Sequence, residues 1–305
     1  MTLLLILLLI LLLIYIKNNI NENFDIFIDN LQKNDNISIN SRLAIVSLVK
    51  SPIDFPLWLK YYRKLGIKKF YIRLEDSPSW EEYIKNNKIN DDIELEIGNS
   101  SDSNNYTTLI ERQKEFVNKI ITKINNNNVD NINWLLHLDS DEILYGDIKI
   151  FDEIPENKHV VQIQNAEALY DDKNNYTCFS SRNFLKCSDG APCKSYVNGK
   201  SGGKIGTNGL YLDGPHLFGI TGATNNDYIL NIPFDKLCVL HFESCTFGQW
   251  AEKFYHLSKN DKNDNPFEYY KLSTNVNQKS YDVYKNHKMQ SINNFNEKHI
   301  FSLDK

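Results

Sequence analysis

Three carboxylates stand within four positions at the end of an apolar run, in the segment WLLHLDSDEIL (residues 134–144). They are Asp139, Asp141 and Glu142. Carboxylates so close together raise one another's pKa values unless a cation compensates, because like charges disfavour the ionised form. The segment is therefore either a solvated turn or part of a metal site, and the rest of the chain has to decide between them.

The chain before this segment reads as alternating strands and helices. Four apolar runs predict strands: RLAIVSLV, KKFYIRL, DIELEI and NWLLHL. A first helix is expected between Asp54, a candidate N-cap, and Gly66, and its stripe of Trp58, Tyr61 and Tyr62 indicates core packing rather than a sugar platform. A second, longer helix is expected over about residues 107–125. This order predicts an α/β fold with a Rossmann-like, mostly parallel sheet and covering helices.

Ligands of such sheets bind beyond the carboxyl ends of the strands. Asp76 follows the second predicted strand and the acidic cluster follows the fourth, so both should reach that edge. Hard oxygen ligands suit Mg²⁺ or Mn²⁺, and a cation held there would neutralise the charge of a departing nucleotide diphosphate. In this context the metal site is favoured over the solvated turn.

Six segments, taken in order, resemble the family 2-like and family 92-like glycosyltransferases: LAIVSLVKSPIDFPLWLKYYRKLGIKKFYIRLEDS, ERQKEFVNKI, WLLHLDSDEIL, SGGKIG, DGPHLF and VLHFES. The resemblance covers roughly residues 42–257. It implies a GT-A-like fold, a nucleotide-sugar donor, a glycan or glycoprotein acceptor, and a D-x-D motif, here Asp139 and Asp141, that binds Mn²⁺ or Mg²⁺. The segment QIQNAEALYDD departs from the family pattern, because it lacks a Trp and a Gly-rich turn after the fifth strand.

The resemblance also implies roles for individual positions. Val49, Lys50 and Asp76 would line the nucleotide pocket, and Arg112 and Gln113 would face the donor from the helix before the motif. The same resemblance implies a single displacement that inverts the anomeric centre, in which a carboxylate removes the proton of the acceptor hydroxyl.

Residues after the motif supply the remaining candidates. His241 ends the apolar run LCVLHF, where a neutral imidazole could complete the metal shell beside the diphosphate. Glu167, Asp213 and Glu243 are candidates for the base by chemistry alone. Lys204 in SGGK could meet a phosphate, although the segment lacks the spacing of a Walker loop.

Two further features leave their alternatives open. His216 in DGPHLF is either a buried, hydrogen-bonded histidine or a ligand. The segment QWAEKFYHLSK predicts an amphipathic helix that closes the domain, with Glu252 and Lys253 on its solvated face.

Rival functions meet specific obstacles in the sequence. A haloacid-dehalogenase-type phosphatase needs Thr where Ile143 stands, and a calcium-binding loop needs Gly and Glu where Leu144 and Ile150 stand. A non-catalytic carbohydrate-binding or assembly protein with a degenerate transferase fold remains as the alternative to the enzyme.

Composition sets the outer limits. The chain has 305 residues, 41% of them hydrophobic, with a net charge of -5, so it can bury a large core and offers no basic face for nucleic acid. Leu3 to Ile16 is uninterrupted apolar sequence without a small-residue cleavage site after it. This predicts an uncleaved membrane anchor over residues 1–16, a stem over 17–41, the transferase domain over 42–260 and a helical or irregular extension over 261–305. A single-pass, type II protein of the ER or Golgi, or of an equivalent membrane, is expected.

The five cysteines show no CxxC spacing, which argues against a structural zinc site. Cys187 and Cys193 in CSDGAPC could close a small disulfide loop, which a lumenal compartment would permit. Because five is odd, at least one thiol must stay unpaired within the chain.

Overall fold

The structure is a computed structural model, and it describes residues 40–52, 54–86, 92–100, 106–170, 178–187, 193, 196–258, 281–282, 284–286 and 295–303. The predicted anchor (1–16) lies outside these residues, as do most of the predicted stem and most of the predicted C-terminal extension. Among the helices of the described ranges, none is long and apolar enough to cross a membrane.

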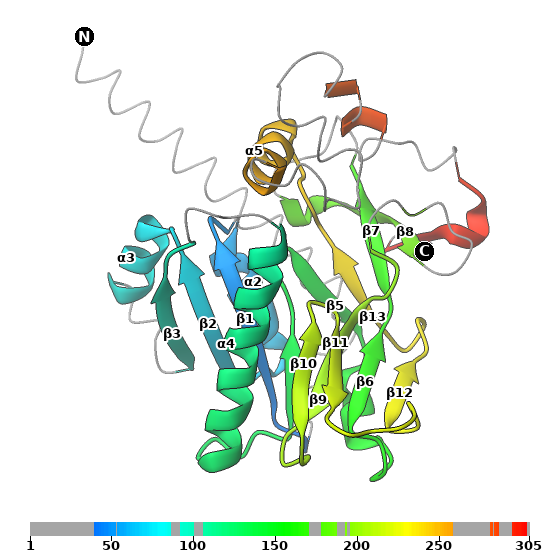
Figure 1. Ribbon diagram of the computed structural model, residues 1–305. Helices are drawn as coiled ribbons and strands as arrows, with labels where there is room; N and C mark the ends of the chain where they lie inside the picture. The colour runs from blue at the N-terminus through cyan, green and yellow to red at the C-terminus, as the bar shows by residue number, and fades with distance from the viewer. Residues whose placement is uncertain are drawn as a thin grey trace.

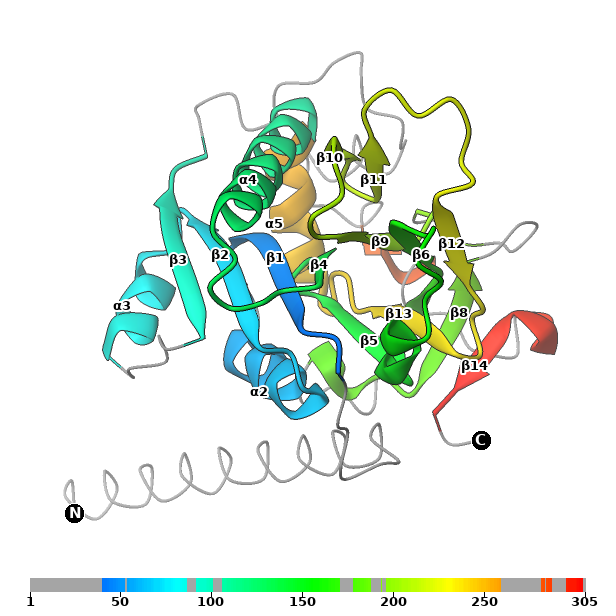
Figure 2. The same ribbon diagram turned by 90° about the horizontal axis from the view of Figure 1, so that it is seen from below.

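The first half of the chain forms the alternating pattern that its apolar runs predict. Its elements are β1 (Leu43–Lys50), α2 (Phe55–Leu65), β2 (Lys69–Glu75), α3 (Pro78–Asn86), β3 (Ile93–Gly98), α4 (Tyr106–Asn126) and β4 (Trp134–His137). Strand β1 pairs in parallel with β2 and β4, and β2 pairs in parallel with β3. Helices α2 and α4 cover opposite faces of these strands (Figure 2). The α/β fold with a mostly parallel central sheet is therefore confirmed.

The second half of the chain completes this sheet and builds another. Its elements are β5 (Glu142–Gly146), β6 (Val160–Ile163), β7 (Asn165–Leu169), β8 (Asn183–Cys187), β9 (Lys200–Lys204), β10 (Leu210–Gly214), β11 (Leu217–Ile220), β12 (Ile229–Ile232), β13 (Leu237–His241), α5 (Phe247–Ser258) and β14 (Ile300–Ser302), with short 3₁₀ turns at Ile148–Asp152, Cys178–Ser180 (η2) and Glu297–His299. The central sheet has the order β12-β6-β9-β4-β1-β2-β3, and β9 runs antiparallel to both of its neighbours (Figure 1).

A second sheet, which the sequence did not predict, has the order β14-β8-β7-β13-β5. Its edge strand β14 comes from the segment expected to be a helical or irregular extension, and it pairs with β8. The chain enters this sheet directly after the acidic motif, because β4 lies in the central sheet and β5 in the second one. The motif is thus the point where the two sheets meet.

Helix α2 holds the start of β5 in place. Gly66 ends the helix with a φ of 100°, a left-handed conformation that glycine adopts without steric cost. Trp58 Nε1 and the Tyr62 hydroxyl both donate to the carbonyl oxygen of Glu142, at 2.9 and 3.0 Å. The aromatic stripe is core packing, as predicted, and it also fixes the backbone beside the motif. Asp54 occupies the N-cap position, but its side chain makes no cap hydrogen bond.

The glycines of SGGK allow β9 to lie close between β4 and β6. A Cβ at Gly202 would lie 2.4 Å from a methyl carbon of Leu136, and a Cβ at Gly203 would lie 2.8 Å from the ring of Phe218. Real side chains cannot approach so closely, so these glycines let β9 pack against the side chains of β4 and of β11. They do not form a phosphate-binding loop.

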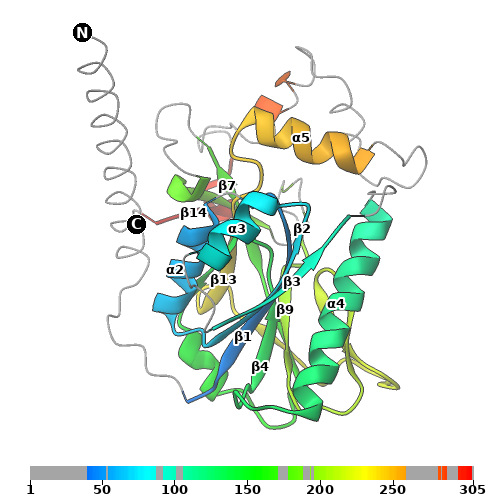
Figure 3. The same cartoon turned by 90° about the vertical axis from the view of Figure 1, so that its left-hand side faces the viewer.

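Apolar side chains pack on both faces of the central sheet, in one cluster against α2 and the second sheet and in another against α4. Helix α5 lies across the carboxyl ends of β1 and β2 (Figure 3). The sheet edge below α5 is therefore where polar side chains can gather without disturbing either core.

The cysteines form two disulfides. The predicted bond between Cys187 and Cys193 is present, and a second bond, not predicted, joins Cys178 to Cys245 across 67 positions of sequence. Cys238 is a free, buried thiol, in agreement with the odd cysteine count.

Candidate functional site

A cleft of about 300 Å³ lies at the carboxyl ends of β1, β2 and β4. It is lined by the end of β1, by α4, by the motif, by η2, and by the junction of β13 with α5. Six predicted site residues line it: Val49, Lys50, Arg112, Gln113, Asp139 and Asp141. The structure therefore brings together, at the expected edge of the sheet, positions that are up to 92 residues apart in the chain.

The first carboxylate of the motif is held by donors from two elements. Lys200 Nζ lies 2.6 Å from Asp139 Oδ2 and 3.3 Å from Glu142 Oε2, and the Lys200 side chain is fully buried. Gln113 Nε2 donates to Asp139 Oδ1 at 3.3 Å. Burial would lower the pKa of Lys200, but Asp139 and Glu142 hold it above its ordinary value, so Lys200 is an ammonium ion. Sequence reasoning missed this lysine.

Glu142 is buried behind Asp139, and its carboxylate stabilises the turn of the motif. Its Oε2 accepts from the backbone N–H of Asp139 at 2.8 Å, and its Oε1 accepts from the hydroxyl of Tyr196. Burial raises the pKa of Glu142, and Lys200 opposes that shift. Glu142 is therefore a structural partner of the motif, not a group that faces the cleft.

The second carboxylate of the motif meets a different set of cations. Asp141 Oδ2 lies 3.6 Å from His241 Nε2 and 3.6 Å from Lys253 Nζ, and its side chain keeps 31% of its surface exposed. The backbone carbonyl of Asp141 also accepts from Phe242 N–H at 2.7 Å, which ties the motif to the end of β13. Burial would raise the pKa of Asp141, but Lys253 and His241 hold it below its ordinary value.

His241 bridges the motif to the second sheet. In the ladders of β13 it stands opposite Glu142 on β5 and Glu167 on β7, and its Nδ1 lies 2.7 Å from Glu167 Oε1. Burial would lower the pKa of His241, but Glu167 and Asp141 raise it well above its ordinary value. Two carboxylates thus flank the imidazole, an arrangement that favours its charged form when no metal ion is bound.

One group of buried side chains has the chemistry of a metal site. Glu167, His241 and Glu243 offer ligand atoms that all lie within 4.8 Å of one another. Glu243 also accepts from Lys253 Nζ at 2.9 Å. The predicted bases Glu167 and Glu243 are thus near Asp141, although neither of them lines the cleft.

At the other end of the cleft, Asp76 is paired with residues beside it. Lys50 Nζ lies 3.0 Å from Asp76 Oδ2 and donates to Ser100 Oγ at 2.9 Å. Ser100 also hydrogen-bonds Asp76, and Lys50 and Ser100 hold the pKa of Asp76 below its ordinary value although burial acts the other way. Lys50 lines the cleft. Asp76 is not among the lining residues and is linked to the cleft by its ion pair with Lys50.

Arg112 is held by an ion pair with a buried carboxylate. Its Nε lies 3.0 Å from Oε1 of Glu75, a fully buried carboxylate that also pairs with Arg73. Glu75 is the last residue of β2 and lines the cleft together with Arg112. The guanidinium thus holds a set position at the edge where α4 meets the sheet.

Two candidate residues from the sequence lie away from the cleft. Lys204 lies opposite Trp134, at the start of β4 and far from the motif, and pairs with Glu156 at 3.1 Å. Asp213 is exposed on β10 and does not line the cleft. Lys253 is exposed, as predicted, with 41% of its side chain accessible, and its ammonium group also pairs with Asp141 and Glu243.

Two histidines lie beside Lys200 and stay neutral. His137 Nδ1 lies 3.1 Å from the carbonyl oxygen of Pro215, and burial together with Lys200 lowers its pKa to about 4. His216 Nδ1 lies 2.9 Å from the carbonyl oxygen of Gly199, and burial lowers its pKa to about 3. His216 thus makes the hydrogen bond of one of its two sequence interpretations, and its role as a ligand stays a prediction.

No known family model matches the chain, and no curated protein matches it. Among solved structures it is similar to HddC from Yersinia pseudotuberculosis complexed with GMP-PN, at 11% identity and a TM-score of 0.35, over 72% of this chain and 99% of that one. A second crystal structure of HddC gives 13% identity and a TM-score of 0.26 over 43% of this chain, and the match spans 64% of HddC. Similarity at this level carries no argument about function.

Proposed function

We propose that this protein transfers a sugar from a nucleotide-sugar donor to a glycan or glycoprotein acceptor. The observation that carries the proposal is the cleft, where the carboxylates of a D-x-D motif meet cationic side chains at the ligand edge of a mostly parallel sheet. Lys50 approaches from β1, Arg112 from α4 and Lys253 from α5. A donor diphosphate is the kind of anion that three such cations would bind.

The donor set also fits a divalent cation. Five carboxylates gather here, Asp139, Asp141, Glu142, Glu167 and Glu243, and the cations paired with them are Lys200, His241 and Lys253. The excess of negative charge matches Mn²⁺ or Mg²⁺, and the part-exposed Asp141, with His241 behind it, is the group best able to hold the ion. When bound, the ion would act as a Lewis acid on the leaving diphosphate.

The remaining chemistry falls to groups of the chain itself. Lys200 and Gln113 keep Asp139 in one position, so that this carboxylate needs no reorganisation when the donor binds. Among the three candidate bases we favour Glu243, because Lys253 pairs both with it and with Asp141, which lines the cleft. As an ionised base it would take the proton of the acceptor hydroxyl in a single, inverting displacement.

One observation favours the non-catalytic alternative. Both oxygens of Asp139 already accept from internal donors, so part of the motif is satisfied without any ligand. A carbohydrate-binding protein with a degenerate transferase site would bind sugars and show no donor turnover.

The test is turnover of nucleotide sugars, as hydrolysis and as transfer, by the wild type and by Asp141→Asn. We expect Asp141→Asn to lose about 10²-fold or more of the rate, the scale of one electrostatic contact at a transition state. Asp235→Asn, an exposed carboxylate outside the cleft, is the matched control. Equal rates in wild type and Asp141→Asn, or undiminished turnover in chelator, would refute the role of the metal. A retained anomeric configuration in the product, read by NMR, would refute inversion.

We also propose an oxidising, lumenal location behind the N-terminal anchor. The two disulfides support it, because such bonds persist in secretory compartments and are rare in the cytosol. Protease protection of the protein in sealed microsomes would test this location.

A further inference from the structure

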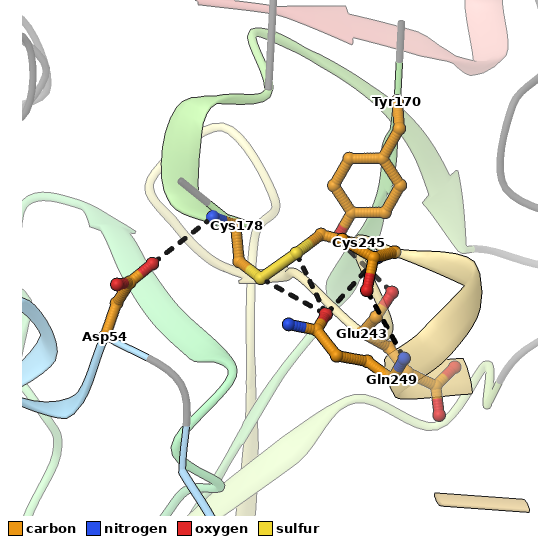
Figure 4. The surroundings of a disulfide bond; sticks show 7 residues. Asp54, Tyr170, Cys178, Glu243, Cys245 and Gln249 are labelled. Carbon is orange, nitrogen blue, oxygen red and sulfur yellow. Dashed lines mark hydrogen bonds between the residues drawn. A yellow bond between two sulfur atoms is a disulfide. The ribbon is translucent and has the colours of Figure 1, made fainter. Parts of the chain in front are cut away.

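The disulfide between Cys178 and Cys245, drawn in Figure 4, reaches the cleft through Cys178. Cys178 begins η2 and lines the cleft, and Cys245 stands two positions before α5. The bond therefore joins two segments that supply the same side of the cleft. The other disulfide, Cys187–Cys193, joins neighbouring segments and neither of its cysteines lines the cleft.

The bond packs against the first turn of α5. Gln249 Oε1 accepts from Thr246 N–H at 3.2 Å, and Thr246 Oγ1 accepts from Gln249 N–H at 3.3 Å, so the two residues cap the helix reciprocally. The same Gln249 oxygen lies 3.1 Å from Cys245 Sγ and 3.5 Å from Cys178 Sγ. The start of the helix and the disulfide are thus one packed unit.

Contacts on both sides hold this unit to the rest of the fold. On one side the carboxylate of Asp54, at the start of α2, accepts from Cys178 N–H at 3.4 Å (Figure 4). On the other side the Tyr170 hydroxyl donates to the carbonyl oxygen of Glu243 at 3.3 Å. Ser244, between Glu243 and Cys245, has a φ of 53°, a costly conformation for a residue other than glycine, which persists where surrounding contacts enforce it.

The position of α5 decides where Lys253 lies. Lys253 Nζ is 2.9 Å from Glu243 Oε1 and 3.6 Å from Asp141 Oδ2. A movement of the helix away from the sheet would lengthen both contacts and widen the cleft. Gln249 and Glu252, which also line the cleft, would move with it.

We propose that the Cys178–Cys245 disulfide positions α5 over the cleft, so that reduction of this single bond weakens binding of a nucleoside diphosphate there. The ligand class rests on the proposed function. In the reduction a dithiol supplies two electrons and two protons, the S–S bond breaks, Cys178 and Cys245 become thiols, and the dithiol becomes its own disulfide.

The experiment compares two variants that each lose one disulfide: Cys178→Ser with Cys245→Ser, and the control Cys187→Ser with Cys193→Ser. Affinity for UDP and for GDP, each with Mn²⁺, is measured by calorimetry, and hydrogen exchange is followed over residues 242–258. We expect the first variant to bind about tenfold more weakly, within the usual range of coupling free energies. Its exchange should accelerate over residues 242–258, while the control stays close to wild type in both measurements.

A third sample guards against a variant that fails to fold. In the protein with Cys187→Ser and Cys193→Ser, Cys178–Cys245 is the one disulfide left, so dithiothreitol acts on this bond alone. Binding should fall on reduction and return on reoxidation. Unchanged affinity and unchanged exchange after loss of the bond would overturn the proposal. If the wild type binds neither diphosphate, the proposed function fails, and the exchange of residues 242–258 alone decides whether the bond positions α5.

Discussion

Replacing Lys200 by methionine should destabilise the fold strongly, although methionine nearly matches the apolar stem of lysine. The change removes an ammonium group from a fully buried position and leaves two carboxylates behind, Asp139 at 2.6 Å and Glu142 at 3.3 Å. Breaking a buried ion pair by removing one partner costs about 3–5 kcal/mol, because the charge that remains is uncompensated.

The exposure of the two partners narrows this range. Asp139 keeps 32% of its side chain exposed and can regain water, whereas Glu142 is fully buried and cannot. The lower end of the range, about 3 kcal/mol, is therefore expected. For a domain of this size such a loss lowers the melting temperature by roughly 6–12 °C.

The matched control is Lys204→Met, the same substitution on the same strand. Lys204 pairs with Glu156, whose side chain is 99% exposed, so its loss should cost less than about 1 kcal/mol. Thermal melting of both variants is followed from pH 9 down to pH 5. The raised pKa of Lys200 keeps its ammonium group charged throughout this range, so its own titration would remove the contribution only at higher pH. Burial raises the pKa of Glu142, so the penalty in Lys200→Met should shrink as the pH falls and this carboxylate takes up a proton. A Lys200→Met protein that melts within about 2 °C of the wild type at pH 7 would refute this account of the buried cluster.

Three more outcomes can be measured. His216→Gln should weaken the fall in the free energy of unfolding at acid pH, measured by denaturant titration. Burial lowers the pKa of His216 from 6.5 to about 3 in the folded protein, so its contribution to stability is present above pH 6.5 and is lost as the pH falls. The slope that the substitution removes is up to about 1.4 kcal/mol per pH unit. Loss of the Cys178–Cys245 disulfide should cost about 4 kcal/mol and loss of Cys187–Cys193 about 2 kcal/mol, because the closed loops span 67 and 6 residues; equal costs would contradict the chain-entropy account. His241→Gln should lower both the melting temperature and donor turnover, because the ring is 5% exposed between Glu167 and Asp141; turnover that survives in the folded variant would remove His241 from the site.

The central sheet could be predicted because its strands carry a strong local signal. Strand β1 is buried on both faces over seven of its eight residues, and such strands appear in a sequence as continuous apolar runs. The acidic motif follows another such run, which is why Asp139 and Asp141 could be assigned to the ligand edge. Local sequence was sufficient here.

The second sheet could not be predicted because its strands lack that signal. Strand β7 reads NAEAL, yet all five of its residues are buried, since Glu167 is compensated by His241, which is 74 positions away in the chain. A partner so distant in the sequence does not change the pattern of apolar and polar residues around the strand itself. Pattern reasoning therefore identified Glu167 by its chemistry and missed its strand.

The two lysines of β9 show the limit most clearly. Lys200 and Lys204 stand at opposite ends of one strand, and only the direction of that strand decides which of them meets the motif. Because β9 runs antiparallel to β4, the first lysine meets Asp139 and the second lies opposite Trp134. Similarly, helical periodicity predicted α5, but it could not show that the face bearing Lys253 turns toward carboxylates.

The place of β5 at the edge of the second sheet has a consequence for the order in which the protein matures on the ribosome. Strand β5 follows the motif at once, yet the strand it pairs with, β13, is synthesised nearly a hundred residues later. Until residues 237–241 emerge, the backbone of residues 142–146 has no ladder partner, and pairing across such a separation forms slowly. The carboxylates should therefore stay apart from His241 while β1 to β4 already fold, which makes the reactive centre one of the last parts of the nascent chain to assemble.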